Sequence, residues 1–388
     1  MTICDRKDCT GCHACYTVCP KSCITMCEDG EGFRYPQIDE TICINCGMCQ
    51  KVCPAVNTAE KRNTITTYAA YSADETEHKT SASGGMAAVF SKNIVKKGGV
   101  VFGAKYNADL SVSHDYSCDA EGIKKFKGSK YLQSVVGDAV KELRTSLLDG
   151  KRVLFIGTPC QTAGVENLRK TFKNSENLIT CDLVCHGTPS YKVMKKYISE
   201  IEQKAGKSAS EIRFRAPDAM VTLYDEQNVF YKGATQRDAY YIGFIKGLFN
   251  RPSCSSCRYA CPQRVSDITI GDFWGLGTTT PFEGSKKDGI SLCMVNTERG
   301  AAFLEECRED LVLYQRETSE AVAGNAQLRA PSVRHKNRDK FFSRFETAGF
   351  NRAAKSCLSR EMLRYRLIGF LSGSVIKVIR PIYKKIKK

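Results

Sequence analysis

A cysteine pattern that occurs twice near the amino terminus constrains this sequence more than any other feature. Of the 21 cysteines, 11 precede residue 54. The first copy of the pattern C-x2-C-x2-C-x3-C-P consists of Cys9, Cys12, Cys15, Cys19 and Pro20. The second copy begins 34 residues later and consists of Cys43, Cys46, Cys49, Cys53 and Pro54. This spacing is typical of 4Fe–4S cluster ligands, so the segment is predicted to hold two such clusters.

The same pattern predicts which cysteines share a cluster. In bacterial ferredoxins with this spacing, the fourth cysteine of each copy ligates the cluster of the other copy. The first predicted ligand set, set I, is therefore Cys9, Cys12, Cys15 and Cys53. The second, set II, is Cys43, Cys46, Cys49 and Cys19. Zinc knuckles are the weaker interpretation, because they use paired C-x2-C units. We expect the other cysteines of the segment, Cys4, Cys23 and Cys27, to be buried thiols.

Charge and compartment set further expectations. The formal net charge is +16, and no charged-then-apolar signal peptide opens the sequence. Because cytosolic thiols stay reduced, the cysteines indicate metal binding or catalysis rather than disulfides. We therefore expect a cytoplasmic protein.

Beyond a polar linker at 57–64, strand-like and helix-like segments alternate, which favours a mixed α/β domain. Strands are predicted at 66–71, 100–106, 153–156 and 178–184. Helices are predicted at 86–97, 135–148 and 191–204, and a further helix follows Cys160 and ends at about 170. The overall fold class is predicted as α+β, with a small ferredoxin-like domain followed by this mixed domain.

Further cysteines stand where two of the predicted strands end. Cys160 and Cys185 follow neighbouring parallel strands, at the edge where open sheets bind ligands and where helix N-termini favour thiolate. Cys254 and Cys257 form a C-x2-C pair in a loop. Together these four are predicted to hold a third 4Fe–4S cluster. Two alternatives stay open: Cys261, which precedes Pro262, replaces one of the four, or the site binds zinc or consists of buried thiols.

Five motifs, in order, resemble those of the family of coenzyme F420 (deazaflavin) hydrogenase/dehydrogenase beta subunits. They are Ser81-Ala-Ser-Gly-Gly85, Gly128-Ser-Lys-Tyr-Leu-Gln-Ser134, Gly157-Thr-Pro-Cys-Gln161, Val184-Cys-His-Gly187, and Cys254-x2-Cys257 followed by Arg264-x2-Asp267-Ile-Thr-Ile-Gly-Asp-Phe-Trp-Gly275. The resemblance covers about 68–297 and implies a flavin-binding domain with FAD beside a 4Fe–4S cluster. Clusters carry single electrons, whereas a flavin collects two.

The resemblance also implies site residues. The residues expected to line the flavin are Ser83, Gly84, Gly85, Lys130, Tyr131, Gln133, Ser134, Thr158, Asp267, Thr269 and Asp272. Lys130 is expected to pair with a phosphate or with the reduced flavin. His186 is a candidate proton donor, and a structural turn histidine is its alternative interpretation. Cys261 departs from the family pattern.

Three functions follow from these features. The first is a flavin-dependent iron–sulfur oxidoreductase that reduces a small organic substrate, by resemblance in surface-polysaccharide synthesis. The second is an electron-transfer subunit that serves a partner enzyme, or a subunit of a deazaflavin coenzyme dehydrogenase. A metal-stabilised scaffold is the third. We expect an electron-carrying protein partner such as ferredoxin, and no nucleic acid, because no recognised binding motif accompanies the charge.

The predicted domains end in a basic segment. They are 1–57, the ferredoxin-type domain; 65–148 and 149–300, the N- and C-terminal domains that the family resemblance implies, the latter with FAD and the third cluster; and 301–388, a helical basic extension. From residue 364 to 388 there are eight basic residues and no acidic one. We expect this end to lie on the inner face of the cell membrane, with a solvated helix as the alternative.

Overall fold

The computed structural model describes residues 2–216, 219–233 and 238–370. The chain forms two compact units. Unit 1 comprises Met1–Tyr191 and Arg251–Val333, and unit 2 comprises Lys192–Asn250 and Arg334–Lys388. The predicted segments 65–148 and 149–300 both contribute strands to one sheet of unit 1. The predicted boundary between them therefore lies inside a compact unit, and the division into four domains stays a prediction.

The amino-terminal module of unit 1 has two halves with the same local conformation. Its elements are α1 (Ala14–Val18), β1 (Ile24–Glu28), β2 (Arg34–Ile38) and α2 (Met48–Lys51), with β1 and β2 antiparallel. The left-handed positions repeat at the spacing of the cysteines: Gly11 and His13 before α1, and Asn45 and Gly47 before α2. A backbone with positive φ lets each loop turn around its three cysteines before the short helix begins.

The main sheet of unit 1 has eight strands in the order β13-β3-β12-β11-β7-β6-β4-β5. The strands are β3 (Thr66–Ser72), β4 (Val100–Tyr106), β5 (Val112–Ser117), β6 (Val153–Gly157), β7 (Leu178–Leu183), β11 (Ile268–Asp272), β12 (Ser291–Val295) and β13 (Leu311–Arg316). Strands β4, β6, β7 and β11 are parallel, and β3 shares their direction because it is antiparallel to β12, which is antiparallel to β11. The carboxyl ends of five strands therefore meet at one edge.

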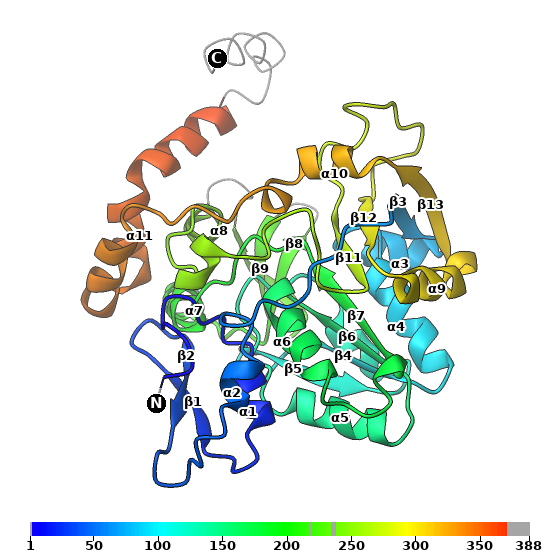
Figure 1. Ribbon diagram of the computed structural model, residues 1–388. Coiled ribbons are helices and arrows are strands. Elements are labelled where there is room, and N and C mark those ends of the chain that lie inside the picture. The colour runs from blue at the N-terminus through cyan, green and yellow to red at the C-terminus, as the bar shows by residue number, and fades with distance from the viewer. Residues whose placement is uncertain (1, 217–218, 234–237, 371–388) are drawn as a thin grey trace. The chain divides into compact units, whose positions relative to one another are not determined.

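Helices cover both faces of this sheet (Figure 1). The helices of unit 1 in this region are α3 (Glu75–Thr80), α4 (Met86–Lys96), α5 (Ala139–Leu148), α6 (Pro159–Arg169), α9 (Glu298–Glu306) and α10 (Thr318–Gly324). Helices α4 and α9 pack on the face that presents Val101, Leu154 and Ile179. Helices α5 and α6 pack on the other face, together with residues of the amino-terminal module. Alternate residues of each buried strand thus enter opposite cores.

Unit 2 combines a small sheet with helices. Its elements are α7 (Tyr191–Ala205), which begins at the last residue of a unit 1 segment, β8 (Glu211–Ala216), β9 (Ala219–Asp225), β10 (Asn228–Gly233), α8 (Ala239–Ile245) and α11 (Arg338–Phe370). Aromatic side chains fill its interior, among them Tyr240, Phe249 and Phe350. Helix α11 is interrupted at Gly349, where φ is 77°, and the Glu200 carboxylate accepts hydrogen bonds from the next two backbone N–H groups. That carboxylate caps the second helical segment.

Most of the predicted elements occur where the sequence places them. The strands predicted at 66–71, 100–106, 153–156 and 178–184 are β3, β4, β6 and β7, and the mixed α/β class is confirmed. The helix predicted at 135–148 begins later, at Ala139. The segment expected to be helical, 301–388, also supplies β13 to the main sheet.

The basic end is described only in part. Helix α11 reaches Phe370, and residues 371–388 of the expected membrane-binding segment lie outside the described residues. Among the described helices, none combines the length and the apolar character that crossing a membrane requires.

Candidate iron–sulfur and redox site

The four cysteines of set I lie together in the structure. Burial, and then the neighbouring thiols of Cys12, Cys9 and Cys53, raise the pKa of Cys15. Burial also raises the pKa of Cys12 to about 12, and again Cys53 and Cys9 are its charged neighbours. Thiols crowded in this way repel each other as thiolates, so they need a cation to hold them. The donor set fits an iron–sulfur cluster, whose irons bind thiolate.

Set II surrounds an open cavity. The cavity is lined by Cys19, Cys43, Cys46 and Cys49, and by Ile44 and Met48 among its apolar residues. Cys46 is exposed, whereas Cys9, Cys15 and Cys53 of set I are buried. The site of set II therefore faces solvent more than the site of set I does.

A fifth thiol stands beside each set. The Cys23 sulfur is 3.4 Å from the Cys19 sulfur. At set I, a hydrogen bond with Cys4, and then the charge of Arg251, lower the pKa of Cys9 to about 6. The expectation that all three remaining cysteines are buried is wrong for Cys27, which is exposed. Cys27 lies on β1, whose alternate residues face solvent.

The third predicted set also comes together. Cys160 lies in the first turn of α6, Cys185 follows β7, and Cys254 lies in a 3-10 turn, Pro252–Ser256, that ends just before Cys257. Burial, and then the neighbouring thiols of Cys257, Cys185 and Cys254, raise the pKa of Cys160. The Cys261 thiol instead donates to the backbone oxygens of Arg258 and Gln263, at 3.6 and 3.3 Å. The geometry favours the set without Cys261.

The expectation that helix N-termini favour thiolate at these positions stays a prediction, and burial acts against it. Burial raises the pKa of Cys160, although this residue lies at the start of α6, and raises the pKa of Cys185 to about 12. Burial disfavours the charged thiolate when no cation is bound. Within the described residues, no three His, Cys, Asp or Glu side chains converge closely enough to bind one metal ion. The thiolates of a cubane each bind a different iron and stand farther apart.

The third set lies against set I. Helix α6 carries Cys160 and, one turn later, Gly164, whose missing side chain leaves room for the Cys12 sulfur. A Cβ atom at Gly164 would be 3.1 Å from that sulfur. The Tyr259 ring lies between the sets: burial, and then Cys160, Cys12 and Cys257, raise its pKa. Its hydroxyl donates to the Pro54 oxygen at 3.1 Å. One helical turn, about 6 Å of rise over four residues, therefore separates the two thiolate sites along α6.

Most of the residues expected at the flavin gather at the carboxyl edge of the main sheet. The Ser81–Gly85 turn follows α3 and returns to the end of β3, where the Gly84 oxygen accepts a hydrogen bond from the Ser72 N–H at 2.7 Å. The Gly84 N–H donates to the Ser291 hydroxyl at 2.9 Å. Ser291 pairs with Asp272 at the end of β11. Thr158 follows β6, and Gln161 links it to Ser134 through hydrogen bonds of 3.0 and 2.9 Å. The predicted residues thus come from different strands but share one edge.

Two polar groups at this edge have no hydrogen bond to another side chain within the described part of the chain. The Ser83 hydroxyl is buried and has no hydrogen-bond partner. The Lys130 ammonium donates only to the backbone oxygens of Phe126, Lys127 and Gly128, at 3.0 to 3.2 Å. Because burial removes water from this ammonium, its pKa falls to about 8. Both groups can bind an anionic or carbonyl-bearing ligand.

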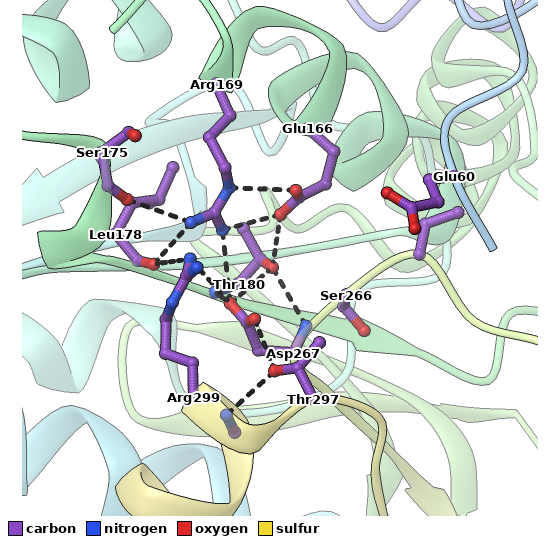
Figure 2. Close-up of polar contacts among 12 residues, drawn as sticks. Glu60, Glu166, Arg169, Ser175, Leu178, Thr180, Ser266, Asp267, Thr297 and Arg299 are labelled. Carbon is purple, nitrogen blue, oxygen red and sulfur yellow. Dashed lines mark hydrogen bonds and ion pairs between the residues drawn. The ribbon is translucent and has the colours of Figure 1, made fainter. Parts of the chain in front are cut away.

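Asp267 has other partners (Figure 2), and Thr269 is also bonded within the protein. The Asp267 carboxylate accepts hydrogen bonds from the Thr180 N–H at 2.9 Å and from the Thr297 hydroxyl at 2.8 Å, and it is 3.3 Å from the Arg169 guanidinium. Thr269 accepts from Arg264 and Asn296, both at 3.1 Å. Asp267 precedes β11, at the edge opposite Asp272. Their flavin role stays a prediction, and the contacts support a structural role.

The remaining predicted residues are dispersed. Gln133 uses its amide to donate to the Thr10 oxygen at 3.0 Å and to accept from Arg251 at 3.0 Å, so it contacts the set I loop. Tyr131 is partly buried. The backbone oxygen of His186 accepts a hydrogen bond from Ser332. His186 lies between Cys185 of the third set and Gly187, and its proposed proton transfer stays a prediction.

Sequence reasoning missed two buried arginines beside the thiolates. Arg251 contacts set I, and Arg264 lowers the pKa of Cys185 and Cys257 against the larger effect of burial. Arg264 forms an ion pair of 3.0 Å with Asp182, and both side chains are buried. Arg264 stands in one of the five family motifs, but nothing in the residues around Arg251 signals its burial.

Comparison with known proteins agrees with this organisation. The family described as the C terminus of the coenzyme F420 hydrogenase/dehydrogenase beta subunit matches residues 150–321. Two descriptions of a 4Fe–4S dicluster domain match residues 8–57 and 35–85. The chain carries the C-terminal domain of this family behind a 4Fe–4S dicluster domain. It is an iron–sulfur protein of an oxidoreductase family.

Individual relatives span much of the chain. Over 324 residues it is 24% identical to a subunit of the F(420)H(2) dehydrogenase of Methanosarcina mazei, covering 79% of this chain and 84% of the relative. Residues of the dicluster segment are 42% identical over 52 positions to an uncharacterized ferredoxin of Methanocaldococcus jannaschii, 13% of this chain and 66% of that protein. A chain in the F420-reducing NiFe hydrogenase complex of Methanosarcina barkeri aligns with a TM-score of 0.49 and 19% identity over 74% of this chain and 94% of that one.

Proposed function

We propose that this chain is the electron-transfer subunit of a deazaflavin coenzyme dehydrogenase. The family match and the relative from the F(420)H(2) dehydrogenase support this function over a role in surface-polysaccharide synthesis. A subunit of this kind works with a protein partner, which either delivers electrons to the clusters or receives them.

The observation that carries the proposal is the contact of the two thiolate sites through α6. Cys12 of set I packs at Gly164, one turn from Cys160 of the third set. Set II has an exposed thiol and an open cavity, so it is the site that a protein partner can approach. The proposed order is therefore set II, set I, third set, and the carboxyl edge of the sheet, in either direction. A 4Fe–4S cluster in each set supplies one-electron transfer.

The carboxyl edge is the proposed FAD site. The unpartnered Ser83 hydroxyl and the Lys130 ammonium fit the polar groups of a flavin nucleotide. At Gly84 a Cβ would be 2.3 Å from the Ala70 oxygen, so the turn lies directly on the sheet and leaves its outer side to a ligand. FAD bound there supplies the exchange between a hydride and single electrons.

Lys130 gives FAD binding a defined pH dependence. The pKa of Lys130 is about 8, so its ammonium is present below this pH and lost above it. Affinity for FAD is expected to fall as the pH rises from 7 to 9. Lys130→Met is expected to weaken binding at pH 7 by roughly tenfold or more, the value of one charge-assisted hydrogen bond, and to remove the pH dependence. FAD affinity is measured by fluorescence quenching of FAD. If it depends on pH equally in the unaltered chain and in Lys130→Met, Lys130 does not bind FAD.

The proposed function is tested with the full chain assembled without oxygen and loaded with FAD. Reduced deazaflavin coenzyme is added, and cluster reduction is followed by electron paramagnetic resonance (EPR). The expected result is reduction of the clusters that depends on FAD. The proposal is wrong if dithionite reduces the clusters but the reduced coenzyme does not, with FAD bound.

A further inference from the structure

Arg251 joins the two thiolate sites through its backbone and its side chain. Its backbone lies at the start of the turn that carries Cys254: the Arg251 N–H donates to the Thr188 oxygen at 2.9 Å, and its oxygen accepts from the Cys254 N–H at 3.0 Å. Its side chain extends instead to the amino-terminal module. There Nε donates to the Cys9 oxygen at 2.7 Å, and Nη2 lies 3.5 Å from the Cys9 sulfur.

The Arg251 guanidinium is buried and meets only uncharged oxygens besides that sulfur. The residue is 2% exposed. Nη2 also donates to the Arg34 oxygen at 2.9 Å, and Nη1 donates to the Gln133 side-chain oxygen at 3.0 Å. The Tyr35 ring lies 4.4 Å from the guanidinium carbon. Among the described residues, no carboxylate lies within ion-pair distance of Arg251.

Such a cation requires an anion. An arginine side chain does not lose its proton in proteins, and a buried charge without a counter-ion is strongly unfavourable. The anionic group that the geometry offers is the thiolate of Cys9 with the cluster it ligates.

We propose that Arg251 is the buried counter-ion of the set I cluster and raises the reduction potential of that cluster. A nearby cation stabilises the reduced cluster, which carries one more negative charge, and hydrogen bonds to sulfur act in the same direction. Arg264, the buried arginine beside the third set, does not add a net positive charge there, because the Asp182 carboxylate forms an ion pair with it at 3.0 Å. This inference rests on the cluster assignments of the proposed function.

The test is a redox titration, followed by EPR, of the full chain assembled without oxygen. Arg251→Gln removes the charge and keeps an amide donor, whereas Arg251→Lys keeps the charge. The matched control is Arg258→Gln, because Arg258 is an exposed arginine of the same loop. The expected result is a lower midpoint potential for one cluster in Arg251→Gln, a potential near the original in Arg251→Lys, and no shift in Arg258→Gln.

The inference is overturned if Arg251→Gln keeps its full iron content and its midpoint potentials do not change. It is also overturned if the midpoint potential that shifts belongs to the cluster that is lost when Cys254 is replaced. If Arg251→Gln loses the set I cluster, Arg251→Lys decides: retention at the original potential supports the counter-ion, and loss shows that the side chain is only structural. Absence of clusters from the unaltered chain would instead overturn the proposed function.

Discussion

Replacement of Cys254 by serine is expected to lower the iron content of the chain from about twelve to about eight atoms, the loss of one 4Fe–4S cluster. Cys254 lies beside Cys160 and Cys185, and its sulfur is 3.4 Å from the Thr188 N–H, which donates to it. A serine oxygen is a poor ligand for iron in such a cluster, which prefers soft thiolate. The amino-terminal pair of clusters should remain, because none of its predicted ligands belongs to this loop.

Cys261→Ser is the matched control for this loss. Cys261 lies in the same loop, but its thiol donates to backbone oxygens. The iron content should therefore stay at the level of the unaltered chain. Iron and acid-labile sulfide are measured together with the EPR spectrum of the reduced protein. Loss of iron in Cys261→Ser and not in Cys254→Ser would make Cys261 the ligand in place of Cys254. If the unaltered chain contains only about eight iron atoms, the prediction of a third cluster is wrong.

Asp267→Ala is expected to destabilise the fold by about 3–5 kcal/mol, the typical cost of removing one partner from a buried charge pair. The substitution removes the acceptor of three groups: the Thr180 N–H, the Thr180 hydroxyl and the Thr297 hydroxyl. The Arg169 guanidinium also loses one carboxylate (Figure 2). The contact between β7 and the start of β11 should loosen first. The measurement is the urea midpoint of the chain assembled without oxygen.

The control for this effect is Asp149→Ala. Asp149 is an exposed aspartate at the end of α5, and its loss should change stability by no more than about 0.5 kcal/mol. FAD affinity is measured on the same variants. Unchanged stability in Asp267→Ala together with weakened FAD binding would favour the flavin role that the sequence predicted for this residue.

Residue patterns of short range were the reliable guide to secondary structure. Val100–Tyr106 and the run beginning at Val153 read as strands because several apolar, β-branched residues follow one another, and they are β4 and β6. The residues expected at the flavin differ in how far the structure supports that role. Ser83 and Lys130 lie where a ligand can use them, whereas Asp267 has its hydrogen bonds satisfied within the protein. Asp267 precedes β11, so it lies at the amino end of this parallel strand, and only Asp272 lies at the carboxyl edge.

The sequence by itself determined that the amino-terminal segment is a 4Fe–4S dicluster domain and predicted its two ligand sets, since three cysteines of each set come from one short loop and their spacing is local. Only the tertiary structure brings Cys160, Cys185 and Cys254 together, through the parallel order of β6 and β7 and the loop before β11, and leaves the Cys261 thiol bonded to backbone oxygens. The same holds for Arg251, whose partner Cys9 is 242 residues away. Long-range convergence depends on how the sheet is assembled, and no local pattern encodes it.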